Sequence, residues 1–141
     1  EPLQYFKDWK FISRNPRERL ELYTTPIYFT DDWLNSAMSH AYQFIYLGPK
    51  GTCTHLHADV INSFSWSAQI AGTKKWMLLP PEVTFLLWDV FGRTLAPHLD
   101  ADEGEMGVLF PGLDIVRRKG FCVPVVQDVG ATVFVPSGWH H

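Results

Sequence analysis

The chain has 141 residues, a hydrophobic share of 46%, an aromatic share of 15% and a formal net charge of −3. This length and composition indicate one packed globular domain and exclude a disordered chain. The near-neutral charge provides no broad basic surface, so we expect neither nucleic acid nor a membrane as a partner.

The two cysteines, Cys53 and Cys122, form no CxxC pair, so neither a zinc ribbon nor a disulfide framework is expected. A reducing compartment is therefore predicted, with the cytoplasm first and the nucleus second. The first residues lack the pattern of a signal peptide. Because residue 1 is Glu rather than Met and His141 follows directly on a strand-like run, we expect a fragment of a longer protein.

Residues 1–41 are expected to form an N-terminal helical flank. In RNPRERLELY, Asn15 can cap a short helix that has Pro at its first position and runs to about Tyr23. In FTDDWLNSAM, Thr30 is expected to cap a second short helix, and the two aspartates favour its positive end.

From residue 42 the pattern favours β-strands. YQFIYLGP, SFSWSAQIAG and KKWMLLPP are aromatic and aliphatic runs that end in Gly or Pro, and ATVFVP follows a turn at Asp128–Gly130. We therefore expect residues 42–141 to form a β-sandwich or small barrel. Residues 82–121 break this pattern and are predicted to be an insertion between core strands, in which FLLWDVF suits either a short helix or a strand.

The segment Thr54–Asp59, THLHAD, carries three potential metal ligands at alternate positions: His55, His57 and Asp59. Alternate side chains of an extended backbone point the same way, so two neighbours of this set can reach one metal ion. A second cluster, PSGWHH, ends the chain with His140 and His141 just past a Pro and Gly turn. Either histidine could supply a third metal ligand from a separate strand.

Two histidines and one carboxylate on one face of an octahedral ion leave three positions open, which suits non-haem iron(II) and oxygen chemistry. A closed structural zinc site would require four protein ligands, usually with cysteine among them. Taken alone, an HxD pair is more often incidental, since six histidines are present. The combination of HxD, a downstream lysine and a distal GWHH in this order favours a metal site.

These motifs are specific enough to indicate a family: the chain resembles the JmjC (jumonji C) domain family of 2-oxoglutarate oxygenases. YLGPKGTCTHLHAD, SFSWSAQIAGTKKWMLLPP and GATVFVPSGWHH correspond in order to the family's iron-binding turn, co-substrate strand and distal-histidine strand. The resemblance runs from about Tyr42 to His141 and implies a double-stranded β-helix, a cupin-like jelly roll. Since the family continues through at least one more strand, we expect the final strand or strands to be missing here.

The resemblance also implies the site residues. It assigns His57, Asp59 and His141 as ligands of iron(II), with His140 as the alternative distal ligand. It matches Lys74 to the lysine that binds the distal carboxylate of 2-oxoglutarate, and Thr54 to a hydroxyl donor for the same group.

For each of these co-substrate residues a structural role is the alternative. Lys74 could be an exposed strand-end lysine, as its neighbour Lys75 is expected to be, and Thr54 could stabilise a turn. Ser65 and Ser67 are weaker candidates for facing the pocket, and we place Ser67 with the co-substrate contacts. For three tryptophans near the motifs core packing is preferred, namely Trp66, Trp76 and Trp139.

The activity implied is hydroxylation of a protein side chain by dioxygen, in which 2-oxoglutarate supplies two electrons and a substrate C–H bond supplies two. SFSWS and PSGWHH are most similar to a branch of the family whose implied substrate is a lysyl residue of a translation release factor. Demethylation of histone N-methyl-lysine is the second candidate. The oligomeric state is left open.

Two other classes of protein are alternatives. A zinc hydrolase of the metallo-β-lactamase type could use HxHxD, but that motif normally continues with a further His where Val60 stands. A non-catalytic cupin-like binding module is the third, because an open barrel would leave an unpaired strand edge.

Overall fold

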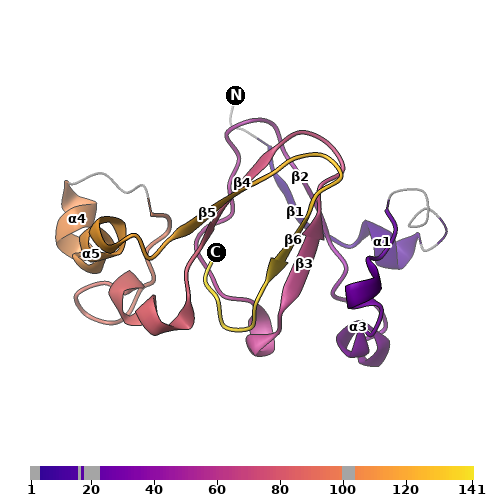
Figure 1. Ribbon diagram of the computed structural model, residues 1–141, viewed down its shortest axis with the longest axis horizontal. Coiled ribbons are helices and arrows are strands. Elements are labelled where there is room, and N and C mark those ends of the chain that lie inside the picture. Colours follow the sequence, from indigo (N-terminus) through magenta and orange to yellow (C-terminus); the bar gives the residue numbers. More distant parts are fainter. Residues whose placement is uncertain (1–3, 16, 18–22, 100–103) are drawn as a thin grey trace. The chain divides into compact units, whose positions relative to one another are not determined.

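The computed structural model describes residues 4–15, 17, 23–99 and 104–141 (Figure 1). The chain separates into two compact units, Glu1–Cys53 and Thr54–His141. The predicted boundary at residues 41 and 42 stays a prediction. In the described part of the chain, no helix has the length and apolar character needed to cross a membrane.

The described residues of the first unit form short elements. Strand β1 (Phe6–Trp9) pairs antiparallel with β2 (Ile45–Leu47), with an irregularity in the register. Between them lie helix α1 (Phe11–Arg14), the 3-10 helix η1 (Ile27–Phe29) and helix α3 (Trp33–Ala37). The helix expected from Asn15 to about Tyr23 falls largely outside the described residues.

The predicted cap of the next helix is wrong. Helix α3 begins at Trp33, and its cap is Asp32, whose Oδ1 accepts a hydrogen bond from the Asn35 N–H at 2.9 Å. The Thr30 hydroxyl instead donates backwards to the Ile27 carbonyl at 3.3 Å. A capping oxygen must reach the second or third N–H of its helix, and Asp32 is the residue at that distance.

The described residues of the second unit include four strands in two antiparallel pairs. Strand β3 (Ser65–Ala68) pairs with β6 (Thr132–Val135), and β4 (Lys74–Leu78) pairs with β5 (Val123–Gln127) (Figure 1). The prediction of a mainly β domain with short helices is confirmed. These described strands form separate two-stranded sheets, so the jelly-roll barrel stays a prediction.

The segment between β4 and β5 holds most of the larger buried cluster of the described chain, which the sequence did not predict. It contains η3 (Pro81–Leu87), α4 (Glu105–Leu109) and α5 (Gly112–Lys119). Of FLLWDVF, Phe85–Leu87 belong to η3. The cluster consists of Leu56, Leu79, Val83, Leu87, Ala96, Leu99, Phe110, Leu113 and Val116. A smaller cluster, of Leu78, Val133 and Val135, lies between strands.

Gly112 allows α5 to lie against η3. A Cβ atom at this position would lie 2.1 Å from the Leu86 carbonyl oxygen, so only glycine fits without a shift of the backbone. The helix ends at Gly120, which has φ of +65° in the left-handed conformation typical of a helix end. Both glycines therefore set the length and the packing of α5.

Asp89 organises the loop that follows η3. Its side chain is 9% exposed. Oδ1 accepts from the Phe91 and Arg93 N–H groups at 3.0 and 2.9 Å, and Oδ2 accepts from the Thr94 N–H at 3.0 Å. These hydrogen bonds, the one from Arg93 first, lower the pKa of Asp89 against the opposing effect of burial.

We expect Asp89→Asn to lower Tm, with a larger effect at about pH 7 than at about pH 3. A carboxylate whose pKa is lower in the folded state stabilises the fold above its ordinary pKa of about 3.9, and this contribution is lost as pH falls through the folded value. Asparagine also has one acceptor oxygen for three N–H groups. Thermal unfolding at both pH values, with Asp114→Asn as the control for loss of one exposed carboxylate, measures this. Equal Tm differences at both pH values would show that the lowered pKa of Asp89 is not the source of the stabilisation.

Candidate metal centre

The segment His55–Asp59 is anchored through Leu56, the residue between its two histidines. Leu56 is buried in the larger cluster, and its N–H donates to the Pro97 carbonyl at 2.8 Å. His57 and Asp59, on alternate positions, therefore share the opposite face. His57 Nδ1 lies 2.9 Å from the His55 carbonyl oxygen. With Nδ1 as the donor, Nε2 of His57 is left with its lone pair.

The end of the chain lies alongside this segment. The His57 N–H donates to the His141 carbonyl at 3.1 Å, and the His141 N–H donates to the His57 carbonyl at 2.8 Å. Residues that exchange both backbone hydrogen bonds are directly opposite each other in an antiparallel pair, and their side chains share one face. The pairing therefore places the His141 imidazole next to that of His57.

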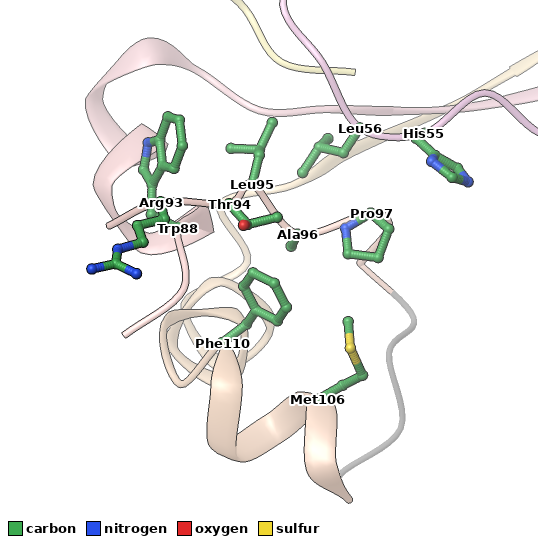
Figure 2. Close-up of a pocket in the computed structure, with 10 residues that line it drawn as sticks. All are labelled: His55, Leu56, Trp88, Arg93, Thr94, Leu95, Ala96, Pro97, Met106 and Phe110. Carbon is green, nitrogen blue, oxygen red and sulfur yellow. The ribbon is translucent and has the colours of Figure 1, made fainter. Parts of the chain in front are cut away.

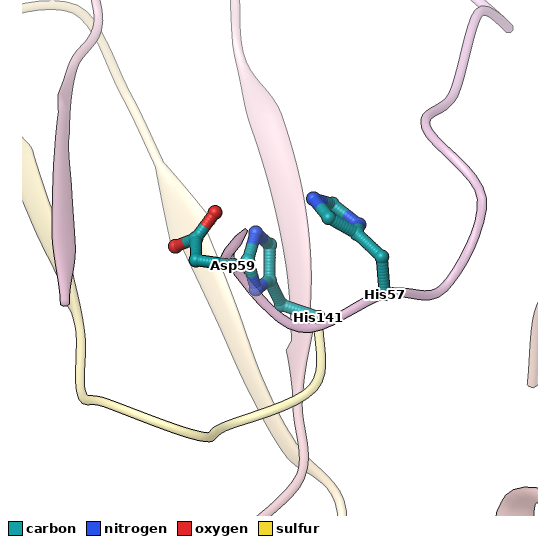
Figure 3. A group of neighbouring side chains, drawn as sticks. All are labelled: His57, Asp59 and His141. Atoms are coloured by element: carbon teal, nitrogen blue, oxygen red, sulfur yellow. The ribbon is translucent and has the colours of Figure 1, made fainter. Parts of the chain in front are cut away.

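Potential ligand atoms of His57, Asp59 and His141 lie within 4.8 Å of one another. The imidazole centroids of the two histidines are 4.3 Å apart, and all three side chains project to the same side of the backbone (Figure 3). All three residues are half-buried. Two imidazoles and a carboxylate at this spacing fit one divalent transition-metal ion with open positions.

A second observation supports this fit. His141 Nδ1 is buried and, within the described residues, has no hydrogen-bond partner. Burial, followed by the charge of His57, lowers the pKa of His141. The neutral imidazole, the form that binds a metal ion, is therefore favoured.

His140 lies on the other face. It exchanges backbone hydrogen bonds with Leu79, at 2.8 and 3.0 Å, and its Nδ1 lies 3.3 Å from the Thr84 hydroxyl. The structure therefore brings His141, and not His140, into the three-residue cluster. His55 is exposed and also lies outside it, so the HxHxD arrangement of a zinc hydrolase is not assembled.

Ser65 orients the carboxylate of the cluster. Its hydroxyl, on β3, donates to Asp59 Oδ2 at 2.6 Å. One carboxylate oxygen is thereby held by the protein, and the other is left for a ligand. Ser65 was predicted only as a weak candidate, because the sequence spacing of a serine in a strand does not distinguish a site residue from any other.

We expect Ser65→Ala to weaken metal binding by about 10- to 100-fold, the usual effect of removing a hydrogen bond that orients a ligand. Equilibrium dialysis with manganese(II) as an air-stable probe measures the affinity. Ser63→Ala is the matched control, because the Ser63 hydroxyl donates to the Val60 carbonyl instead. An unchanged affinity in Ser65→Ala would contradict the orienting role.

Lys74 lies at the start of β4, on the same face as Trp76. Its Nζ is 4.8 Å from the centroid of the Trp76 ring, and the Trp76 ring centroid is 5.6 Å from that of His141. Burial lowers the pKa of Lys74, because the ammonium loses hydration. Lys75, on the opposite face, is exposed as predicted. A half-buried cation beside the cluster suits an anionic ligand.

The other predicted co-substrate residues, Thr54 and Ser67, precede and follow the HxD segment in the chain. Thr54 and Ser67 are half-buried, and the backbone carbonyl of Ser67 accepts from Gln127 Nε2 at 2.6 Å. Their roles stay predictions. Trp76 and Trp139 pack against the smaller cluster, as expected, and Trp76 is in addition a neighbour of Lys74 and His141.

A separate hollow of about 670 Å³ lies on the side of His55 and Leu56 (Figure 2). Residues of the 88–110 segment form most of its wall, including Trp88, Arg93 and Phe110. None of the three cluster residues lines it. The cluster is therefore a site distinct from this hollow.

Comparison with known proteins gives consistent matches. A sequence model of the family described as "JmjC domain, hydroxylase" matches residues 44–141. Two proteins named 2-oxoglutarate and iron-dependent oxygenase JMJD4, from Gallus gallus and Danio rerio, are each 42% identical over 97% of this chain. The Arabidopsis thaliana protein named arginine-specific demethylase JMJ20 is 35% identical over 100% of it. The chain spans 32% of the length of these two JMJD4 proteins and 33% of JMJ20.

Proposed function

Because the chain belongs to the JmjC domain family, we propose that it carries the iron(II)- and 2-oxoglutarate-binding centre of a dioxygenase that hydroxylates a protein side chain. The observation that carries this proposal is the cluster of His57, Asp59 and His141 within 4.8 Å, with a half-buried lysine nearby. The names of the JMJD4 relatives, which state iron and 2-oxoglutarate dependence, support it.

In this proposal His57, Asp59 and His141 hold iron(II), and Ser65 fixes the orientation of Asp59. Iron(II), when bound, supplies the activation of dioxygen, with two electrons from decarboxylation of 2-oxoglutarate to succinate and two from a substrate C–H bond.

The co-substrate is held by different residues. The Lys74 ammonium binds the distal carboxylate of 2-oxoglutarate, and the hydroxyls of Thr54 and Ser67 donate hydrogen bonds to the co-substrate. A charge-assisted hydrogen bond in a half-buried place is among the stronger polar contacts. The protein's task is to position the reactants and exclude water rather than to act as a general acid or base. The fold proposed around the centre is the double-stranded β-helix of the family.

For the substrate, we propose a lysyl residue of a translation release factor, which would place the reaction in the cytoplasm. The SFSWS and PSGWHH motifs support this branch of the family. Demethylation of an N-methyl group is the second candidate, since a relative is named arginine-specific demethylase. Mass spectrometry of a treated substrate separates the two: hydroxylation adds one oxygen atom, and demethylation removes a methyl group.

The test is an anaerobic titration with iron(II) and 2-oxoglutarate, on this chain and on the full-length protein, monitored by the visible charge-transfer band of chelated 2-oxoglutarate. A band in either supports the oxygenase centre. If neither gives a band, the proposal fails and a cupin-like binding module is favoured.

A further inference from the structure

We infer that Trp76, oriented by Gln127, is a positioning residue that fixes the positions of both the Lys74 ammonium and the His141 imidazole. The inference rests on the proposed function, because it concerns the residues proposed to bind 2-oxoglutarate and iron. It adds that one indole ring couples the two binding sites, so that a change in its orientation is transmitted to both.

The Trp76 ring is a neighbour of both groups. Lys74 and Trp76 are on one face of β4, and Nζ of Lys74 lies 4.8 Å from the ring centroid, within the distance of about 6 Å at which a cation interacts with an aromatic face. The ring planes of Trp76 and His141 are inclined at 41°, with centroids 5.6 Å apart. Both groups therefore have the same ring as a neighbour.

Gln127 fixes the orientation of this ring. Its side chain is 0% exposed, and its Oε1 accepts from Trp76 Nε1 at 2.7 Å. Its Nε2 donates to the carbonyls of Ser67 and Ala131, at 2.6 and 3.0 Å. The indole N–H is only a donor and both carbonyls are only acceptors, so the amide has one satisfied orientation. The ring is held by an amide that cannot flip without losing all three of these hydrogen bonds.

The position of Gln127 in the sheets explains how this bond is maintained. It is the cross-strand partner of Lys74 in the β4–β5 pair. Its amide also reaches Ser67 of β3 and Ala131, the residue before β6. One side chain thereby connects both strand pairs of the second unit at the point nearest the lysine. Without the Gln127 side chain, the indole ring of Trp76 would lose its fixed orientation, while β4 would stay paired with β5.

The test uses the full-length protein and the variants Gln127→Met, Trp76→Phe and Trp76→Leu. Anaerobic titration gives the Kd for iron(II), the Kd for 2-oxoglutarate and the energy of the charge-transfer band. We expect Trp76→Leu to weaken 2-oxoglutarate binding about tenfold and shift the band. Trp76→Phe, which keeps a ring without the N–H, should show a smaller change. In the Trp76→Phe background, Gln127→Met should add little, since the shared hydrogen bond is already absent.

Leu87→Val is the control for stability alone, because Leu87 is 0% exposed in the larger cluster, whereas Trp76 packs against the smaller one. It should lower Tm and leave the band and both Kd values unchanged. If wild type shows a band and Trp76→Leu or Trp76→Phe matches it in band energy and Kd, the inference is overturned while the proposed function stands. If wild type shows no band, the proposed function itself fails.

Discussion

Replacing Asp59 by alanine is expected to abolish 2-oxoglutarate-dependent turnover. Asp59 supplies the only carboxylate of the cluster, and its Oδ2 is already held by Ser65 at 2.6 Å. The remaining two histidines would have to bind iron(II) alone, so we expect metal affinity to fall by more than about 100-fold, a larger effect than that of removing an orienting hydrogen bond. Succinate formation measures turnover, and equilibrium dialysis with manganese(II) measures metal affinity.

Asp114→Ala is the matched control, because the Asp114 carboxylate is exposed on α5 and pairs with Arg118 at 2.6 Å. An exposed pair of this kind contributes little to stability. The control should retain turnover and metal affinity. Turnover retained by Asp59→Ala would remove Asp59 from the ligand set, whereas equal losses in both variants would point to a general effect of losing a carboxylate.

Replacing Lys74 by alanine is expected to weaken 2-oxoglutarate binding while iron(II) stays bound. A hydrogen bond to a charged group contributes about 1.5–3 kcal/mol, which corresponds to an increase in Kd of about 10- to 150-fold. The low hydration that lowers the pKa of Lys74 also strengthens its interaction with a carboxylate. Anaerobic titration of the charge-transfer band gives the Kd for 2-oxoglutarate, and dialysis gives the metal affinity.

Lys75→Ala supplies the comparison for this variant. Lys75 is adjacent in sequence, but it lies on the exposed face of β4 and carries the same charge. Its replacement should leave both affinities unchanged. If Lys74→Ala binds 2-oxoglutarate as tightly as wild type, Lys74 is not the co-substrate anchor.

The sequence predicted the local part of the site because that part depends on alternation. His55, His57 and Asp59 stand at alternate positions, so spacing predicted that neighbours among them share a face, and the family resemblance then selected His57 and Asp59. The choice between His140 and His141 depended on register with a distant segment, and a shift of one residue reverses the face. The family resemblance favoured His141, and the backbone pair with His57 supplies the physical reason.

Other features could not be predicted because several segments create them together. Gln127 ends an apolar strand, a position where a polar residue usually faces water, and its burial requires partners from Ser67, Trp76 and Ala131. The larger buried cluster combines residues of η3 and α5 with residues outside the helices, namely Leu56, Leu79, Ala96, Leu99 and Phe110. Its members are distributed over short elements, so no single window of sequence shows a helical or strand period.

The reciprocal backbone hydrogen bonds between His57 and His141 also bear on how the sequence can diverge. The distance between these two side chains is set by main-chain atoms, which every residue type except proline provides in the same form. Substitutions at flanking positions such as Ala58 can therefore accumulate without altering the separation of the two imidazoles. Most substitutions at neighbouring positions are therefore expected to leave the geometry of the metal ligands unchanged.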